Sequence, residues 1–423
     1  MDYDVSVIGL GRVGLPLALS FADAGLRVLG VERDLERVAC LRDGRMPFVE
    51  PGADELLTRV LERGTFDLTE RAGDASRAES IVLTVGTPTF SHIEIDMGDI
   101  RSVLDDLLPV LEPGHLLVLR STVAPGTTEF VAGYLEKQRG FTVGEDVFVA
   151  HVPERIAAAK FLEEIRTLPC IVGGVGEGSG ERAAKLFEVF EAPIVQTSPV
   201  QAELAKIWAN ILRYATFALP NLLMMDCERY GANVFEVINL INENYPRGGM
   251  KLPGFTAGTC LRKDFAFSEE RSWAPGMLLA VSRVNEGVPN FLVDGVKRRL
   301  GHADTLRDRK VAVLGLAFKQ DTDDERDSLS HKLIRLLERE LADVAVHDPV
   351  VPTPTASFEE AVAGADVVVV ATNHSAYSKP ECLRKIIDTA SSECLVVDPW
   401  NAFGTEQVFG YAAELSALLP AAS

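Results

Sequence analysis

The first half of the chain alternates short, continuous apolar runs with helical patterns. Five runs have the character of strands: DVSVIGL (4–10), LRVLGVE (26–32), ESIVLTVG (79–86), GHLLVLRST (114–122) and DVFVAHVPE (146–154). They are apolar at consecutive positions rather than at alternate ones, which is typical of parallel strands buried on both faces. Helical patterns such as 12–24 and 99–111 separate them. This series predicts an α/β fold with an N-terminal Rossmann-type, doubly wound sheet.

The pattern changes at Pro199. Residues 199–230 form one long, largely apolar helical pattern, and strand patterns return from residue 309 onward. We therefore predict three parts: an N-terminal α/β domain (1–198), a central section of long helices (199–300) and a smaller C-terminal Rossmann-like α/β domain (301–423). A long apolar helix between two α/β units often forms a dimer surface, although it can equally be ordinary core.

Composition narrows the class of protein. A net charge of −20 over 423 residues argues against a surface that binds nucleic acid or an anionic membrane. No apolar run approaches the length of a membrane span, and the start enters a fold without the features of a signal peptide. The six cysteines are scattered and lack metal-ligand spacing. We expect a reduced, cytoplasmic protein without a metal site.

The segment GLGRVG places Gly9, Gly11 and Gly14 in a GxGxxG pattern between a strand and a helix. In dinucleotide-binding folds, such glycines permit the tight turn, the approach of a pyrophosphate and the packing of helix on strand. The next strand ends at Glu32, where a carboxylate would hold a ribose diol. This context predicts NAD binding, while the neighbouring Arg33 leaves NADP open.

Three further strand ends carry polar loops. They are VGTPT with Thr87, RSTVAPGTT with Thr122 and VPERI with Glu154. Ligands of doubly wound sheets bind at the carboxyl ends of the strands, which favours a role at a site. Taken singly, each loop could be ordinary turn chemistry and Glu154 a surface carboxylate.

Two polar residues interrupt the apolar helix that begins at Pro199. Lys206 and Asn210 are four residues apart and therefore share one helical face. A lysine in such surroundings must extend its ammonium group to water, pair with an acid or serve a ligand.

The segment GTCLRKD surrounds Cys260 with charged residues. A lone cysteine is usually a small buried hydrophobe. Here Arg262 and Lys263 could favour the reactive thiolate, and Asp264 could act as a base or orient a water molecule.

These motifs together resemble the UDP-glucose/GDP-mannose dehydrogenase family, the nucleotide-sugar 6-dehydrogenases. GTCLRKD resembles the family's G-x-C-x-x-K-D motif. The other motifs fall in family order: the GxGxxG turn, VGTPT, STVAPGTT, PER, the helix with Lys206 and Asn210, and GLAFKQDTDDERDS near the C-terminus. The likeness covers nearly the whole chain.

The resemblance implies an N-terminal NAD domain, a central helical section with the dimer contact and a C-terminal domain that helps bind the sugar nucleotide. It also implies two NAD-dependent oxidations at C6 of the sugar, from alcohol through aldehyde to acid. Cys260 would add to the aldehyde, and the thiohemiacetal would lose hydride to give a thioester that water hydrolyses.

Roles for individual residues follow from the same resemblance. Lys206 and Asn210 would bind substrate and stabilise oxyanions, while Asp264, Thr122 and Glu154 would position water and protons. Cofactor contacts would come from the glycine turn, Glu32, Thr87, Thr122, Lys263 and Arg326. The loop from Phe255 to Gly258, with Lys319, would hold the sugar diphosphate. Arg247 matches an arginine of the family's loop, although the loop of this chain is shorter.

The sugar is less sharply indicated. PERI resembles family members that act on N-acetylhexosamines, but AAAKF follows where those members tend to carry Pro-Gly. We therefore expect UDP- or TDP-glucose as substrate, with a UDP-N-acetylhexosamine (ManNAc or GlcNAc) as the alternative. Two other classes stay open: a one-step hydroxyacid dehydrogenase of similar fold and a non-catalytic nucleotide-binding regulator. We also expect a homodimer or a larger oligomer built from dimers.

Overall fold

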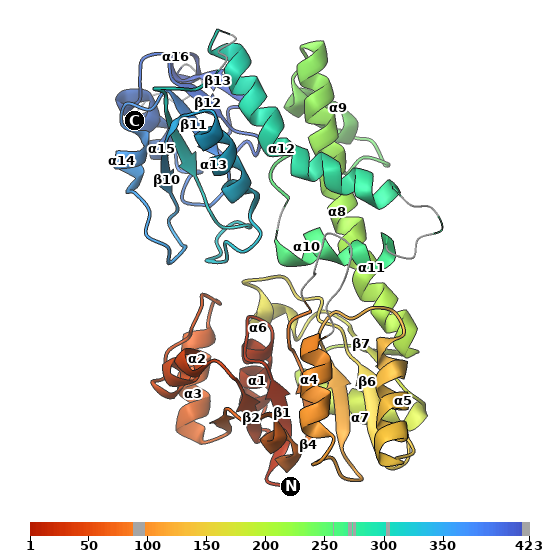
Figure 1. Ribbon diagram of the computed structural model, residues 1–423. Coiled ribbons are helices and arrows are strands. Elements are labelled where there is room, and N and C mark those ends of the chain that lie inside the picture. The colour runs from red at the N-terminus through yellow and green to blue at the C-terminus, as the bar shows by residue number, and fades with distance from the viewer. Residues whose placement is uncertain (88–97, 257, 270–272, 274–275, 302–304, 417–423) are drawn as a thin grey trace. The chain divides into compact units, whose positions relative to one another are not determined.

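A computed structural model describes the chain except residues 88–97, 257, 270–272, 274–275, 302–304 and 417–423 (Figure 1). The chain divides into two compact units. Unit 1 comprises Met1–Ala209 with Ala266–Arg271, and unit 2 comprises Asn210–Phe265 with Ser272–Ser423. The finer division into three parts, at residues 198 and 300, stays a prediction.

Unit 1 contains an eight-stranded sheet in the order β3-β2-β1-β4-β5-β6-β7-β8. Neighbouring strands run parallel except β6 and β7, which are antiparallel. The strands are β1 (Tyr3–Ile8), β2 (Val28–Val31), β3 (Phe66–Thr69), β4 (Ala78–Leu83), β5 (Leu116–Leu119), β6 (Phe148–His151), β7 (Cys170–Gly174) and β8 (Ile194–Thr197). The order confirms the Rossmann-type sheet.

Helices cover both faces of this sheet, which explains why its strands are continuously apolar. Successive strand residues divide between two buried clusters: Val5 and Val7 belong to one, Ile8 to the other. The first cluster includes α1 (Gly14–Asp23), α3 (Ala53–Arg63) and α7 (Glu177–Phe187); the second includes α4 (Gly98–Leu107) and α5 (Thr127–Arg139). The remaining short helices are α2 (Leu35–Arg42), η1 (Ala72–Arg77), α6 (Phe161–Glu164), η2 (Glu188–Phe190) and α11 (Ala266–Glu269).

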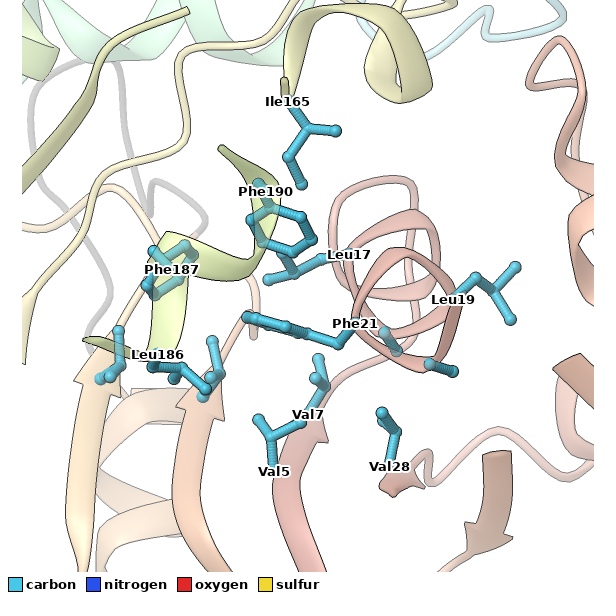
Figure 2. Packing of buried hydrophobic residues seen from close by; sticks show 14 of the residues in the cluster. Val5, Val7, Leu17, Leu19, Phe21, Val28, Ile165, Leu186, Phe187 and Phe190 are labelled. Carbon is cyan, nitrogen blue, oxygen red and sulfur yellow. The ribbon is translucent and has the colours of Figure 1, made fainter. Parts of the chain in front are cut away.

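Aromatic rings form the centre of the first cluster (Figure 2). The ring of Phe21, on α1, lies 5.4 Å from that of Phe187 and 4.8 Å from that of Phe190. These centroid distances are typical of favourable aromatic pairs. The cluster fixes α1, and with it the glycine turn at the helix's N-terminus, against the sheet.

The long helix predicted from residue 199 is α8 (Pro199–Tyr230). The chain passes from unit 1 to unit 2 within it, between Ala209 and Asn210. Within the residues described, no helix combines the length and the apolar character that crossing a membrane requires.

Unit 2 contains a five-stranded sheet in the order β10-β9-β11-β12-β13, parallel except for β13. The strands are β9 (Lys310–Leu314), β10 (Asp343–His347), β11 (Val367–Val370), β12 (Leu395–Val397) and β13 (Phe409–Tyr411). Its helices are α9 (Val234–Asn242), α10 (Thr259–Asp264), α12 (Met277–Arg299), α13 (Leu329–Arg339), α14 (Phe358–Val362), α15 (Pro380–Thr389) and α16 (Ala412–Leu415). Residues of α8, α9, α12 and α13 pack on one face, and residues of α14, α15 and α16 on the other.

The predicted fold class is therefore confirmed, but the apolar pattern did not predict two of the strands. β3 reads FDLT and β13 reads FGY. Both are short, lie at sheet edges and carry too few apolar residues to distinguish a strand from a loop.

Candidate active site

The predicted residues of unit 1 gather at the carboxyl ends of its parallel strands. Gly9 follows β1, Glu32 follows β2, Thr87 lies beyond β4, Thr122 beyond β5 and Glu154 beyond β6. The strand order reverses between β1 and β4, and this switch point is where doubly wound sheets bind ligands. The topology therefore places five separate sequence motifs along one edge of the sheet.

The glycine turn has the geometry that a dinucleotide requires. Gly9 adopts φ +93°, in the left-handed region. A Cβ at Gly14 would lie 1.9 Å from the Gly9 carbonyl oxygen and 2.2 Å from Thr84 Oγ1, so the helix packs closely here. At Gly11, by contrast, an added Cβ would meet nothing within 4 Å. The turn thus leaves open space where the backbone can approach a pyrophosphate, and the residues present fit NAD.

Glu32 is buried and tied to the glycine turn. Its Oε2 accepts hydrogen bonds from the Leu10 N–H at 2.9 Å and from Arg37 at 2.8 Å, and its Oε1 accepts from the Asp34 N–H at 3.0 Å. A carboxylate offers about four acceptor sites. Three protein donors therefore leave room for a ribose hydroxyl.

The loops after β4 and β5 are joined by hydrogen bonds. Thr87 Oγ1 donates to the Thr122 carbonyl at 2.9 Å, and Ser121 Oγ donates to the Val85 carbonyl at 2.6 Å. Thr122 itself is half-buried. Pro88 and Thr89, which complete the VGTPT segment, lie outside the described residues.

Glu154 is held by a partner that the sequence analysis missed. Its Oε2 accepts from Arg120 at 2.6 Å, its Oε1 accepts from the Ile156 N–H at 2.7 Å, and both side chains are buried. Arg120 directly precedes Ser121 in the RST segment. A charged residue at the end of a buried strand could have indicated, from the sequence alone, that Arg120 has a buried acidic partner. Both carboxylate oxygens are engaged, so Glu154 is a fixed carboxylate and not a surface one.

A neutral histidine lies at the same sheet edge. His151 ends β6, is fully buried, and its ring nitrogens have no hydrogen-bond partner among the described residues. Burial, together with the nearby positive charges of Arg120 and Lys206, lowers the pKa of His151 to about 3. The imidazole therefore stays uncharged at neutral pH.

Lys206 is 9 % exposed on α8 and, within the described part of the chain, makes no hydrogen bond or ion pair. A buried ammonium group without a partner is costly, which favours the interpretation that it serves a ligand. Asn210, one turn later, donates from Nδ2 to Asp264 Oδ2 at 2.5 Å. The two residues predicted to share a helical face thus differ: one is unpaired and the other orients a carboxylate.

Cys260 lies in the first turn of α10 and is exposed. Asp264 follows four residues later on the same face and is fully buried. Lys263 is half-buried in the last turn of the helix. Arg262 instead donates to Glu286 Oε1 at 2.5 Å and to the Asp327 carbonyl at 3.1 Å. Its charge is therefore balanced by Glu286.

The loop before Cys260 is fixed by contacts that no linear motif indicated. A Cβ at Gly254 would meet the ring of Trp400 at 2.4 Å, and one at Gly258 would meet the ring of Phe318 at 2.6 Å. Both glycines have positive φ. The side chain of Phe255 is buried in the core of unit 2, so its ring is not exposed to a ligand. Ala257 lies outside the described residues.

A buried asparagine pair supports this loop. Asn221 Nδ2 donates to Asn285 Oδ1 at 2.9 Å, and Asn221 Oδ1 accepts from the Gly254 N–H at 2.8 Å. The pair joins α8, α12 and the loop. The polar Asn221 within the apolar pattern of α8 could have been noticed in the sequence, but only the fold determines that its partner is Asn285.

The three remaining predicted residues lie on loops of unit 2. Lys319 is half-buried after β9. Arg326 makes a bidentate pair with Asp324, at 2.7 and 2.9 Å, and this hydrogen bonding raises the pKa of Arg326. Cys260 also contributes to that shift, so the guanidinium lies within electrostatic range of the thiol. Arg247 is exposed and donates to Tyr245 Oη at 2.9 Å.

Sequence comparison identifies the domains to which these parts are similar. Residues 3–191 match the NAD binding domain of the UDP-glucose/GDP-mannose dehydrogenase family, residues 200–287 match its central domain, and residues 312–405 match its UDP binding domain. The chain is thus matched along nearly its whole length.

One relative and two solved structures illustrate the similarity. UDP-N-acetyl-D-mannosamine dehydrogenase from Pyrococcus horikoshii is 33% identical over 88% of this chain and 89% of its own length. A solved structure of UDP-D-ManNAc dehydrogenase from the same organism superposes with a TM-score of 0.88 at 31% identity, covering 95% and 96% of the two chains. A UDP-glucose dehydrogenase from Pyrobaculum islandicum gives a TM-score of 0.82 at 29% identity, covering 94% of each.

Proposed function

This chain belongs to the UDP-glucose/GDP-mannose dehydrogenase family and is an NAD-dependent nucleotide-sugar dehydrogenase, and from that premise we propose that its substrate is a UDP-N-acetylhexosamine. The similarity to UDP-N-acetyl-D-mannosamine dehydrogenases carries this proposal and favours N-acetylmannosamine as the sugar. It favours the alternative stated from the sequence over UDP- or TDP-glucose. The non-catalytic regulator has no support, because the family and its relatives are oxidoreductases.

The first oxidation converts the C6 alcohol to an aldehyde. Bound NAD supplies the hydride acceptor. The unpaired ammonium group of Lys206 stabilises the negative charge that develops on O6 as the alcohol proton leaves. Thr122 and the fixed carboxylate of Glu154 orient the water that receives the proton.

The second oxidation requires the cysteine. The Cys260 thiolate adds to the aldehyde carbon, and the oxygen takes up a proton to give a thiohemiacetal. The C6 hydrogen would then pass as hydride to a second molecule of NAD while the hydroxyl proton leaves to water, which gives a thioester. Asp264 lies one helical turn from Cys260 and is held by Asn210, so it can orient the water that hydrolyses the thioester. Hydrolysis releases the carboxylate and restores the thiol.

The sugar diphosphate is held by backbone and cations of unit 2. We assign the diphosphate to the loop that ends at Gly258, whose own N–H donates to the Asp327 carbonyl at 3.3 Å, and to the positive charges of Lys319 and Arg326. Arg247 makes a further, weaker contact because it is exposed and already donates to Tyr245. These assignments extend the predicted roles of the same residues.

We also propose that two copies of the chain associate through α8. Leu212 is 68% exposed, Leu219 58% and Leu222 46%, an unusual number of large apolar side chains for one helix facing water. Leu212→Glu should convert a dimer into a monomer in sedimentation analysis. An unchanged sedimentation coefficient would place the interface elsewhere.

A substrate panel tests the proposed chemistry. Initial rates of NADH formation are measured with UDP-N-acetylmannosamine, UDP-N-acetylglucosamine, UDP-glucose, TDP-glucose and GDP-mannose, with reactions that lack the sugar nucleotide as the control for background oxidation. The proposal expects the highest kcat/KM with UDP-N-acetylmannosamine. A preference for UDP- or TDP-glucose would contradict it and restore the first expectation from the sequence.

A further inference from the structure

One buried carboxylate has no part in the chemistry described above. Glu203 lies on α8, is 1% exposed and precedes Lys206 by three residues, so the two side chains lie on adjacent turns of one helical face. Burial raises the pKa of Glu203, while hydrogen bonds from Thr128 and Gly126 act in the opposite direction. A carboxylate retained at such cost requires a structural or functional reason.

Glu203 accepts three hydrogen bonds from the start of α5. Its Oε2 accepts from the Gly126 N–H at 2.7 Å, and its Oε1 accepts from the Thr128 N–H at 2.8 Å and from Thr128 Oγ1 at 2.6 Å. The first N–H groups of a helix have no partner within it and are usually capped by the preceding side chain. Gly126 is the N-cap here and has no side chain, so a carboxylate 75 residues away in sequence replaces it.

The segment held in this way is the loop that carries Thr122. Its beginning is fixed by the hydrogen bond from Ser121 to Val85 and by the hydrogen bond that Thr122 accepts from Thr87. Its end, at Gly126 and Thr128, is fixed by Glu203 alone among the side chains of α8 whose hydrogen bonds are described. The loop is therefore anchored to the neighbouring strand at one end and to the Lys206 helix at the other.

We propose that Glu203 is a positioning residue that holds the Thr122 loop at a constant separation from Lys206. The inference rests on the proposed function only in treating Thr122 and Lys206 as residues of the reacting site. Catalysis is sensitive to displacements of about 1 Å, which can cost roughly 100-fold in rate. Loss of the Glu203 contacts would let the loop move while the protein remained folded.

The test compares Glu203→Gln with Glu129→Gln, a control that removes the same charge from an exposed acid in the first turn of α5. The amide side chain of the Glu203→Gln variant can still accept hydrogen bonds through its one oxygen, but it has no second acceptor. Hydrogen exchange of the backbone at residues 121–131 should become about tenfold faster in Glu203→Gln, because a hydrogen bond to a charged group is lost. The control should exchange like the wild type.

Kinetics provide the functional readout. Glu203→Gln should lower kcat about 10- to 100-fold while KM for the sugar nucleotide changes less than about threefold, since loop position and not ground-state contact is altered. Thr128→Val removes a single donor and should give a smaller change of the same kind. It also carries the test if Glu203→Gln does not fold. In the double variant the two effects on kcat should not add.

Two results would overturn the proposal. One is faster exchange at residues 121–131 with unchanged kcat, which would make the contact merely structural. The other is wild-type exchange in Glu203→Gln. The exchange experiment needs no sugar nucleotide, so its failure is distinguishable from that of the proposed substrate, which would appear as a wild-type enzyme inactive on the panel.

Discussion

The two sheets of the molecule begin in the same way and then diverge. Gly9 (φ +93°) directly follows β1 and Gly315 (φ +101°) directly follows β9, and each glycine packs against the chain just beyond the neighbouring strand, at Thr84 and Thr372. A carboxylate at the end of the next strand then accepts the following N–H: Glu32 from Leu10 at 2.9 Å, and Asp348 from Leu316 at 2.6 Å. The local chemistry of the two turns is therefore nearly identical.

The difference lies in the segment after each turn. After Gly9 the chain enters α1 at Gly14, so a helix N-terminus lies beside the turn, where a pyrophosphate can bind. After Gly315 a long loop intervenes before α13 begins at Leu329, and it carries Lys319 and Arg326. The first arrangement presents backbone amides, which suit a phosphate, whereas the second presents charged side chains. The loop after the turn, and not the turn itself, decides which ligand each unit can hold.

The largest expected effect concerns the residue that has no counterpart in unit 1. Cys260→Ala should lower the rate of carboxylate formation at least about 1000-fold, because the aldehyde then lacks the nucleophile that makes a second hydride transfer possible. The affinity for NAD, measured by fluorescence titration, should stay within about twofold, since the glycine turn is untouched. Substantial acid formation by this variant would contradict the assignment of the second oxidation to Cys260 of unit 2.

Glu32 and Asp348 occupy corresponding positions in the two sheets, but replacing each by its amide should affect the protein differently. Asp348 is buried with His374, whose Nε2 lies 3.0 Å from Oδ2. Burial alone would raise the pKa of Asp348, but the hydrogen bonds from His374 and from backbone N–H groups outweigh it and keep the pKa below its ordinary value. Asp348→Asn should therefore reduce the free energy of unfolding by about 3–5 kcal/mol, as measured by urea denaturation.

Glu32→Gln should instead raise KM for NAD about tenfold with little loss of stability, because one charged acceptor for the ribose is lost. Glu36→Gln, at an exposed position in the first turn of α2, is the matched control. If Glu32→Gln proved as destabilising as Asp348→Asn, both carboxylates would have to be regarded as structural.

A third difference between the two sheets lies at the ends of β5 and β12, which occupy corresponding places in the strand orders. β5 is followed by Arg120, which is paired with Glu154, whereas β12 is followed by Asp398, whose Oδ1 has no hydrogen-bond partner in the described part of the chain. Burial raises the pKa of Asp398 to about 6, although N–H groups including that of Phe403 counteract it. The folded state therefore holds its proton more tightly than the unfolded chain, in which the pKa is about 3.9.

The stability that this proton contributes is present below about pH 4 and is lost as the pH rises to about 6, a difference of at most about 3 kcal/mol. Asp398→Asn cannot ionise. The wild type should thus lose stability relative to this variant between pH 4 and pH 7, which urea denaturation at both pH values would detect. A constant difference between the two proteins would contradict the prediction.

The smallest effects separate the two glycine turns. Gly11→Ala should leave stability unchanged, because an added Cβ meets nothing within 4 Å, but should raise KM for NAD by obstructing the pyrophosphate. Gly315→Ala should cost about 2 kcal/mol of stability, since its Cβ would lie 2.5 Å from that of Thr372 and φ is positive. The Gly315→Ala enzyme that remains folded should bind NAD normally. If Gly11→Ala lowered stability and Gly315→Ala raised KM for NAD, the proposed difference between the two turns would be contradicted.

Much of this organisation could be predicted from the sequence because it depends on local patterns. Continuous apolar runs such as those of β1 and β5 indicate two-sided burial, and the GxGxxG spacing specifies a turn. The partners of buried polar groups could not be predicted in the same way. Arg120 and Glu154, Glu203 and Thr128, and Asn221 and Asn285 are all distant in sequence, so only the fold determines which donor meets which acceptor.

The roles of the site residues could be predicted only through the family resemblance. Nothing in the sequence showed that Arg262 would pair with Glu286, or that the side chain of Phe255 would enter the core. Substrate choice was the least accessible feature. The PERI segment resembled enzymes for N-acetylhexosamines, but the AAAKF that follows led us to expect a glucose, whereas the relatives include UDP-N-acetyl-D-mannosamine dehydrogenases.

The central claim is that one site carries out two oxidations through Cys260. The most direct test is the amount of NADH formed per UDP-N-acetylmannosamine consumed, measured to completion with limiting sugar nucleotide. The account predicts two NADH per sugar and a uronate product. One NADH per sugar with an aldehyde product would contradict it and would leave Cys260 without its assigned role.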